Sequence, residues 1–328
     1  MTAPSSCASS FGPGSLPRLT CARAPLTHAV QVINERGEQE EVHIPAERPL
    51  TVYVDKRELV TLMTLGAEPE LLVLGYLRNQ RLVDSVFDIE SITVDWDVHA
   101  AAVRTRHGIA RIEERTASKV VTTGCGQGSV FGGLMDEVDR IALPDATITQ
   151  ADLYGLVNAM RLKESTYKSA GSVHGCALFR GAELLMFVED VGRHNAIDTI
   201  AGWMWMHGEH PEAAQPHAPS PDAAGQAALV DAVHTPMQGS DKVFYTTGRL
   251  TSEMVIKSAQ MGVPIVVSRS GMTQMGHSVA RQLGLCAIGR ATNRRFVCYS
   301  GAHRLLLQPE LAQAPVVAPQ ALAAAPAD

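Results

Sequence analysis

The sequence predicts an α/β protein in which a small mixed α/β domain precedes a larger domain with helices packed against a sheet. Strand-like segments with β-branched residues dominate the first third of the chain. From residue 243 onward, short apolar strands alternate with helical segments, which is typical of an α/β sheet. The chain has 328 residues, of which 45% are hydrophobic, so it is long enough to bury one large core or two modest ones.

The first domain is expected at residues 26–115, after a Ser-, Pro- and Gly-rich tail at 1–25 that we expect to be disordered. A helix is predicted over 69–79, because Pro69 suits a first helical turn and apolar residues recur at helical spacing. The strands predicted around this helix lie at 29–34, 41–44, 50–54, 91–95 and 98–105.

The second domain is expected at 116–307. Thr149 can cap a helix over 150–163, and Arg180-Gly181 indicates a hairpin between two strands. The Ala-, Pro- and His-rich stretch 208–239 is predicted to be a low-complexity insertion, and 308–328 a disordered tail. The strands expected in this domain are 119–123, 176–179, 183–188, 243–246, 264–268, 285–288 and 295–299, and its other helices 195–206, 251–261 and 276–283.

Charge and hydropathy exclude several classes of protein. With 28 Lys and Arg against 34 Asp and Glu, the net charge of −6 argues against a polybasic nucleic-acid binder. No apolar run reaches the roughly 18–20 residues of a membrane helix, and the first 25 residues lack the pattern of a signal peptide. We therefore expect a cytoplasmic protein that binds neither nucleic acid nor membrane. Its six cysteines contain no C-x-x-C pair and should be free thiols.

The strongest chemical signal is a cysteine between glycines, Gly124-Cys125-Gly126, directly after a predicted strand. Glycines allow unusual backbone angles and can turn N–H groups toward the sulfur, which favours the thiolate. A phosphatase loop would need arginine where Phe131 stands, and a dithiol redox site would need cysteine at Gly128. The pattern favours a covalent carrier. The alternative is a Gly-rich turn that happens to contain a cysteine.

Two polar segments flank the next predicted strands. His174, in GSVHGC at 171–176, is a candidate base, ligand contact or metal ligand, or else a structural histidine. The segment 189–198 places Arg193 at a strand-to-helix junction, where α/β sheets commonly bind ligands. In the alternative interpretation, Asp190 caps the helix and pairs with Arg193.

Three more strand ends carry arginine. Gly248, Arg249 and nearby hydroxyls form a candidate anion site in the segment 246–253, although ordinary helix capping would also explain the hydroxyls. Arg269 follows the next predicted strand, and Arg290 is the last residue of the segment 285–290. Arginine with Gly or hydroxyl residues at several strand ends indicates one long, phosphate-bearing ligand across the edge of the sheet.

These segments together resemble the formate dehydrogenase accessory sulfurtransferase family (FdhD) over roughly residues 28–305. The matching pieces are TTGCG at 122–126, GSVHGCAL at 171–178, EDVGRHNAID at 189–198, TTGRLTSEMVIK at 246–257, GVPIVVSRSG at 262–271 and GRATNRRFVCYS at 289–300. The resemblance implies a cytidine-deaminase-like three-layer α/β core preceded by the smaller domain.

The resemblance also implies a function. Cys125 would become a persulfide loaded by a cysteine desulfurase, supported by Gly124, Gly126 and His174. The sulfur would pass to the molybdenum cofactor, Mo-bis(molybdopterin guanine dinucleotide), before that cofactor enters formate dehydrogenase. The cofactor is then a transferred ligand, with no permanently bound metal, and a homodimer is expected. The residues predicted to bind the cofactor are Leu285, Cys286, Ala287, Ile288, Gly289 and Arg290, together with Arg193, His194, Arg249 and Arg269.

The sequence departs from the family pattern at two points. Gly128 stands where many members have a second loop cysteine, which leaves Cys125 as the candidate carrier. An early arginine of the 285–290 segment is absent, and Arg281 or Arg294 is the candidate replacement.

Two other functions compete with sulfur transfer. A zinc nucleoside deaminase needs H-x-E and P-C-x-x-C, but Cys176 stands two residues after His174 and the chain has no C-x-x-C. A non-covalent molybdenum-cofactor chaperone of formate dehydrogenase remains open.

Overall fold

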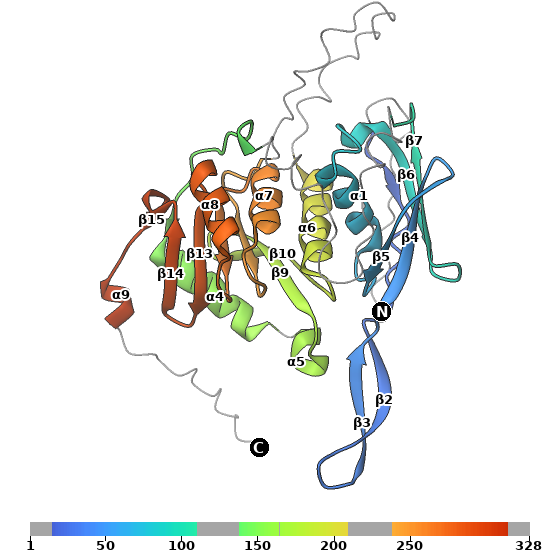
Figure 1. Ribbon diagram of the computed structural model, residues 1–328, viewed down its shortest axis with the longest axis horizontal. Coiled ribbons are helices and arrows are strands. Elements are labelled where there is room, and N and C mark those ends of the chain that lie inside the picture. The colour runs from blue at the N-terminus through green and yellow to red at the C-terminus, as the bar shows by residue number, and fades with distance from the viewer. Residues whose placement is uncertain (1–14, 110–137, 164, 209–237, 314–328) are drawn as a thin grey trace, which may run out of the picture.

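The computed structural model describes residues 15–109, 138–163, 165–208 and 238–313. It is a mixed α/β fold in which two sheets flank the helices α1 and α6 (Figure 1). The smaller sheet has five strands in the order β1-β6-β7-β4-β5. Its elements are β1 (Arg18–Leu19), β4 (Arg48–Val54), β5 (Arg57–Thr64), β6 (Ile89–Asp95) and β7 (Ala100–Thr105), with α1 (Pro69–Asn79) packed on one face.

A separate two-stranded hairpin, β2 (Thr27–Ile33) and β3 (Gln39–Pro45), projects from the body of the molecule (Figure 1). Its turn is held by Asn34, whose Oδ1 accepts hydrogen bonds from the backbone N–H groups of Arg36 at 2.9 Å and Glu38 at 3.1 Å. Asn side chains commonly stabilise turns in this way.

The larger sheet has six strands in the order β10-β9-β11-β12-β13-β14. The neighbours β11, β12 and β13 are parallel, and the helices α7 and α8 connect them, as parallel strands require. The strands are β9 (His174–Arg180), β10 (Glu183–Asp190), β11 (Val243–Thr246), β12 (Ile265–Ser268), β13 (Cys286–Thr292) and β14 (Arg295–Ser300).

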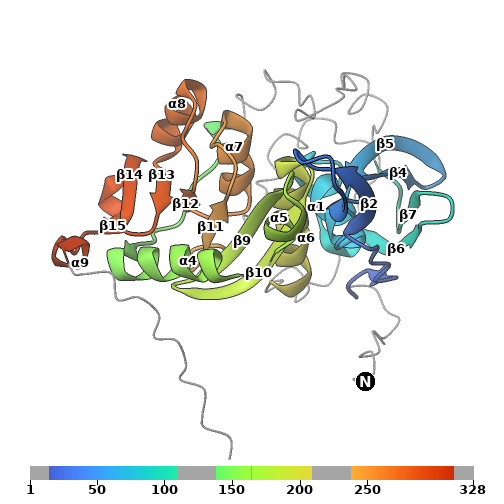
Figure 2. The same ribbon diagram turned by 90° about the horizontal axis from the view of Figure 1, so that it is seen from below.

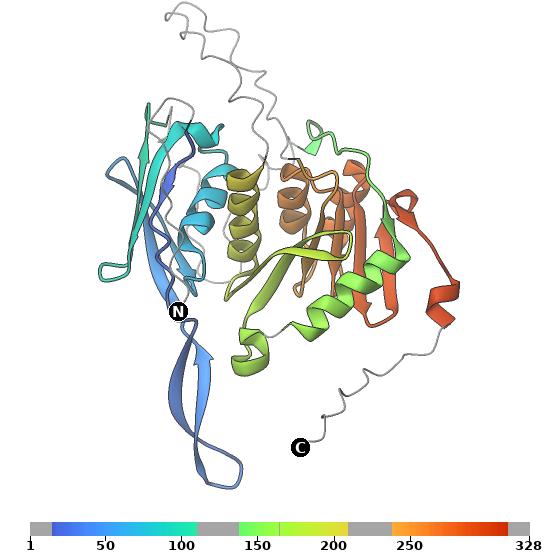
Figure 3. The same cartoon turned by 180° about the vertical axis from the view of Figure 1, so that it is seen from behind.

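Helices cover both faces of this sheet and give it three layers (Figures 2 and 3). The helix α4 (Gln150–Leu162) lies on one face, and α6 (Arg193–His207), α7 (Ser252–Gln260) and α8 (Gln274–Leu283) lie on the other. Strand residues alternate between the layers: Ile265 and Val267 belong to the core on the α4 side, and Val266 to the opposite core. None of the helices in the described ranges is long and apolar enough to span a membrane.

The two domains meet where α1 crosses α6. A Cβ atom on Gly75 would overlap the backbone carbonyl of Asp198, and one on Gly202 would overlap that of Leu71. The helices therefore approach so closely that only glycine fits at the crossing. A second junction is Asp190, which accepts hydrogen bonds from Thr64 Oγ1 at 2.5 Å and from the backbone N–H of Leu65 at 3.2 Å.

The structure confirms the helix predicted at 69–79 and the strand predicted at 243–246. It also confirms the cap of α4, because Thr149 accepts a hydrogen bond from the Asp152 backbone. The predicted strand 119–123 and most of the predicted insertion 208–239 lie outside the described residues.

The prediction of a disordered tail at 1–25 is wrong for its last residues, which belong to the fold. The strand β1 pairs with β6, and Trp96 Nε1 donates a hydrogen bond to the Ala22 carbonyl at 2.6 Å. At the other end, α9 (Glu310–Gln313) lies within the predicted tail. Two elements were not predicted from the sequence: β5, whose apolar residues do not alternate cleanly, and the short helix α5 (Thr166–Ala170). A two-stranded pair, β8 (Ile148–Thr149) with β15 (Leu305–Leu306), completes the fold.

Candidate functional site

The predicted polar segments come together at one end of the six-stranded sheet, where its parallel strands have their carboxyl ends. We call this end the strand edge. The parallel strands β11 and β12 both end there, at Thr246 and Ser268. Because β9 runs antiparallel to β11, its first residue, His174, lies at the same edge, and Asp190 at the end of β10 pairs with it. The end of β10 leads into α6, which brings Arg193 to this edge.

Backbone and hydroxyl hydrogen bonds hold the loops of this edge in place. Gly175 N donates to Thr247 Oγ1 at 3.0 Å, and Thr247 N donates to the Gly175 carbonyl at 2.9 Å. Ser268 Oγ donates to the Gly248 carbonyl at 2.6 Å, and Arg269 N to the Thr246 carbonyl at 3.0 Å. The loops are therefore bonded to one another and form a preorganised surface.

Gly248 lets two of the predicted site residues approach each other. A Cβ atom at this position would lie 3.3 Å from Arg193 Cδ and 3.6 Å from His174 Nδ1. The bare backbone of Gly248 thus provides the surface on which the arginine and the imidazole pack. A larger residue would push at least one of them away.

The electrostatics at this edge favour a neutral imidazole and a bound anion. Burial lowers the pKa of His174, and the positive charges of Arg193, His194 and Arg249 lower it further. Arg193 Nε is buried and lacks a hydrogen-bond partner within the described ranges. A buried donor without an acceptor costs about 1–3 kcal/mol, so a ligand oxygen at this position would be favourable.

The arginines that follow the parallel strands are exposed. Arg249 and Arg269 come from the loops after β11 and β12, and both side chains are accessible to solvent. Arg290 N donates to the Ser270 carbonyl at 2.7 Å, which joins the β13 segment to the same edge. These side chains could hold the phosphates of a ligand in bidentate contacts.

His194, predicted to bind the cofactor, lies behind this surface rather than on it. Its side chain is only 4% exposed, and Nε2 lies 2.9 Å from Glu253 Oε2, an ion pair when the imidazole is protonated. Burial raises the pKa of Glu253, but the contact with His194 and the charges of Lys257 and Arg193 outweigh it and lower the pKa overall. His194 can therefore influence a ligand only through its neighbours.

A buried polar network continues from Glu253 into the protein. Lys257 Nζ lies 4.0 Å from Glu253 and donates to both oxygens of Asp198 at 2.9 Å. Asn79 Nδ2 on α1 donates to the same carboxylate at 2.7 Å. No role was predicted for these residues from the sequence. The available signal was the i, i+4 spacing of Glu253 and Lys257 on one predicted helix.

Four of the residues predicted to bind the cofactor are buried in the two cores of the larger domain. Leu285 and Ala287 pack in the core beneath α8, and Cys286 and Ile288 pack in the core on the α4 side, all with 0% exposure. They are core residues because β13 is covered on both faces, as a parallel strand between two helical layers usually is.

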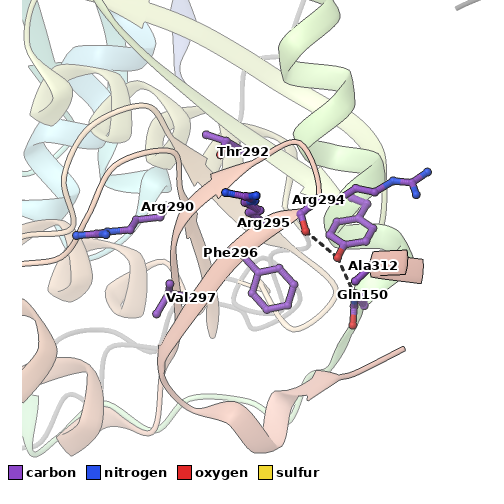
Figure 4. A pocket seen from close by; sticks show the side chains of 9 residues that line it. Gln150, Arg290, Thr292, Arg294, Arg295, Phe296, Val297 and Ala312 are labelled. Carbon is purple, nitrogen blue, oxygen red and sulfur yellow. Dashed lines mark hydrogen bonds between the residues drawn. The ribbon is translucent and has the colours of Figure 1, made fainter. Parts of the chain in front are cut away.

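Gly289 and Arg290 remain candidates for ligand contact in this segment. A Cβ atom on Gly289 would lie 2.7 Å from the ring of Tyr299 and 2.9 Å from the Ser270 carbonyl. Arg290 and Arg294, one of the two candidate replacements for the missing arginine, both line a hollow of about 590 Å³ (Figure 4), and Arg294 donates to the Leu311 carbonyl. Arg281, the other candidate, lies on α8.

The predicted carrier Cys125 and its neighbours Gly124 and Gly126 lie outside the described residues. Cys176, in contrast, is fully buried next to Thr246, and burial raises its pKa to about 12. A buried thiol of such high pKa is a poor nucleophile. Within the described ranges, no group of three or more His, Cys, Asp or Glu side chains is placed to hold a metal ion.

Fold and edge together define an α/β protein of two packed domains with an arginine-bearing surface at the strand ends. The model of the FdhD/NarQ family matches residues 45–218 and 222–306, and the chain belongs to this family.

Relatives match along most of their length. The chain is 26% identical to the sulfur carrier protein FdhD of Geobacillus kaustophilus over 275 residues, which are 84% of this chain and 94% of that protein. It is 27% identical to the sulfur carrier protein FdhD of Bacillus subtilis, over 83% and 94% of the two chains. The crystal structure of a candidate formate dehydrogenase accessory protein from Desulfotalea psychrophila has the same fold, with a TM-score of 0.62 and 22% identity over 86% of this chain and all of that one.

Proposed function

We propose that this protein is a sulfur carrier for formate dehydrogenase. It takes persulfide sulfur from a cysteine desulfurase onto Cys125. It then passes the sulfur to the guanine-dinucleotide form of the molybdenum cofactor before that cofactor is inserted into the enzyme. The observation that carries the proposal is the arginine-bearing strand edge in a chain whose relatives are named sulfur carriers. The three layers of the larger domain support a cytidine-deaminase-like core as part of the same proposal.

The first chemical step is an exchange at sulfur. The Cys125 thiolate attacks the terminal sulfur of the desulfurase persulfide, a new S–S bond forms on Cys125, and the desulfurase cysteine leaves as a thiolate. The persulfide keeps the proton of the transferred sulfur until it ionises. No outside oxidant is needed, because the oxidising equivalent travels with the transferred sulfur.

The second step delivers that sulfur to the metal centre of the cofactor, which is the substrate. The S–S bond of the Cys125 persulfide breaks, and its electron pair stays with Cys125 as the thiolate. A reduced metal centre supplies the two electrons of the new metal–sulfur bond and is itself oxidised. Cys125 thus returns to the state in which it can accept another sulfur.

The strand edge would hold the cofactor during this step. Arg193, Arg249, Arg269 and Arg290 supply guanidinium groups that suit phosphate oxygens, and the buried Nε of Arg193 is a donor in need of an acceptor. The neutral His174 beside them would let the site change its charge by one proton as the anion enters.

A second function uses the same edge without covalent chemistry. The arginine surface by itself would suffice for a non-covalent chaperone that binds the molybdenum cofactor for formate dehydrogenase. The two functions differ only in whether Cys125 accepts sulfur.

The test is to incubate the purified full chain with a cysteine desulfurase and cysteine and to analyse its peptides by mass spectrometry. We expect one added sulfur atom on the Cys125 peptide, loss of that sulfur in Cys125→Ala, and its retention in the control Cys21→Ser. Sulfur found only on Cys176, Cys286 or Cys298 would contradict the assignment. Normal maturation of formate dehydrogenase with Cys125→Ala would favour the chaperone instead.

A further inference from the structure

The hairpin of β2 and β3 stands apart from both sheets and has an apolar face. In its register Val30 lies opposite Val42, and Val32 and Ile44 lie two residues further along on the same face. The strand β3 contacts the short helix α5, yet Ile44 remains 42% exposed and the three valines are partly exposed. A two-stranded hairpin is at best marginally stable in water unless its apolar face is packed, so this face is suited to cover another protein surface.

The tip of the hairpin is strongly acidic. The residues 34–41 include four glutamates and one arginine. Glu40 lies opposite Val32 in the register, so it ends the apolar face on the side of the tip, and both Glu40 and Glu35 are exposed. A surface that fits this hairpin must therefore combine exposed apolar side chains with positive charge.

The strand edge has this combination. Arg249 and Arg269 are exposed, and Met275, in the first turn of α8, is 46% exposed. Arginine and methionine are both enriched in protein interfaces. The hairpin projects at the same end of the molecule as the strand edge, but its tip points away from the body (Figures 1 and 3). The tip therefore does not lie on the strand edge of its own chain, and a second copy offers the matching surface.

We propose that this hairpin, which we call the arm (residues 27–45), docks on the strand edge of a second copy of this chain. In a two-fold dimer the contact is reciprocal, because each copy offers one arm and receives one. The apolar face of the arm covers Met275, and the exposed glutamates of the arm face the two exposed arginines. Strands of seven residues at about 3.3 Å per residue give the arm a length of roughly 23 Å, which is enough to extend onto a neighbouring molecule.

Pairing of two arms with each other fits the charges less well. It would bring glutamates against glutamates, and like charges placed opposite each other cost binding free energy. Docking of arm on strand edge instead pairs opposite charges in both halves of the dimer. It also places acidic side chains of one copy beside the arginines of the other, so the partner copy forms part of each strand edge. This interface does not depend on sulfur transfer by Cys125.

The experiment reverses charges in the full chain and follows the dimer by sedimentation velocity. The arm variant carries Glu35→Lys and Glu40→Lys, and the edge variant carries Arg249→Glu and Arg269→Glu. We expect a dimer for the wild type and, for each variant alone, a dissociation constant raised by at least about 10-fold, because like charges then meet. An equimolar mixture of the two variants should recover the wild-type affinity, since every arm then meets a strand edge of opposite charge.

A control variant, Asp97→Lys with Glu183→Lys, changes the net charge as much as the arm variant does. Both positions are exposed and lie outside the arm and the strand edge, so this variant should dimerise like the wild type. A second readout leaves every charge unchanged. Benzoylphenylalanine in place of Val32 is activated by light in a mixture of isotope-labelled and unlabelled chains, and we expect it to link to a peptide within residues 249–275 of the other copy.

A wild-type chain that stays monomeric at about 100 μM would overturn the proposal. The same holds for a dimer that persists unchanged in both charge variants, and for a mixture that stays monomeric although both variants keep the wild-type circular dichroism. A link from position 32 only within its own chain, or to a peptide away from the strand edge, would also overturn it. Failure of the proposed function looks different, because it appears as a Cys125 peptide without added sulfur and leaves the dimer unaffected.

Discussion

The ion pair between Lys257 on α7 and Asp198 on α6 offers a sharp test of how the site is supported. Lys257 Nζ donates to both carboxylate oxygens at 2.9 Å, and the two side chains are 3% and 0% exposed. Lys257→Met keeps the aliphatic stem and removes the ammonium group. It leaves the Asp198 carboxylate buried, with the neutral Asn79 amide as its remaining side-chain donor among the described residues.

Removing one partner of a buried pair costs about 3–5 kcal/mol, because an uncompensated charge stays in the interior. Asp198→Asn combined with Lys257→Met removes both charges and keeps the shape of the site. We expect the double variant to lose only about 0–2 kcal/mol, which implies a coupling energy of at least about 2 kcal/mol between the two positions.

The measurement is urea unfolding, followed by circular dichroism and by the fluorescence of the three tryptophans, Trp96, Trp203 and Trp205. Coincident transitions would justify a two-state free energy for a protein of this size. The control is Lys242→Met, since Lys242 pairs with Asp241, whose side chain is 47% exposed, and its loss should cost no more than about 1 kcal/mol. A cost below about 1 kcal/mol for Lys257→Met, or strictly additive effects in the double variant, would refute the reasoning.

Three further predictions concern the helix crossing, the imidazole and the arginine surface. Gly75→Ala places a methyl group against the Asp198 carbonyl and should lower the free energy of unfolding by about 1–3 kcal/mol in the same urea assay; an unchanged midpoint would contradict the close crossing. The folded protein binds a proton on His174 less readily than the unfolded chain does, because burial and neighbouring cations lower its pKa. Stability should therefore fall as the pH drops below the unfolded pKa of about 6.5, and His174→Gln should flatten this dependence in urea midpoints measured from about pH 5 to 8; an identical slope in the variant would exclude the effect. Arg249→Ala should weaken binding of GDP, which carries the guanine and diphosphate parts of the proposed cofactor, by about 10- to 100-fold in calorimetric titration, as expected for a lost charge-assisted hydrogen bond. Arg180→Ala, at the opposite end of β9, should leave the affinity for GDP unchanged. Equal losses of affinity in both variants would place the binding site elsewhere.

Local signals explain which elements the sequence predicted well. Pro69 favours the first turn of α1 and Thr149 caps α4, so both helices begin where the sequence predicts. The short strand β1 has no such signal, because it exists only through its pairing with β6, far along the chain. Long-range pairing of this kind cannot be read from a two-residue segment.

The site shows the same division between local and long-range information. Strand ends with arginine and glycine could be recognised one by one, and the parallel topology then brings them to one edge. Burial could not be predicted for His194, because a polar residue in the first turn of a helix is usually exposed. Here Asp198 is buried against Asn79 on α1 and Lys257 on α7, and Asn195 is buried where it donates to the Met63 carbonyl on β5 and to Asp190.

The charges of the site are layered, and this explains how an acidic chain can present a cationic surface. The outer layer consists of Arg193, Arg249, Arg269 and Arg290 at the strand ends. Behind it, Glu253 contacts His194 and lies 4.0 Å from Lys257, and Asp198 pairs with Lys257. Arg193 lies close enough to Glu253 to lower the pKa of that carboxyl, whereas Arg249 and Arg269 are exposed and accessible to a ligand. A buried donor such as Arg193 Nε would be costly to maintain in a surface that served only the fold. Its position is best explained if an anion completes the hydrogen bonds that the protein leaves open.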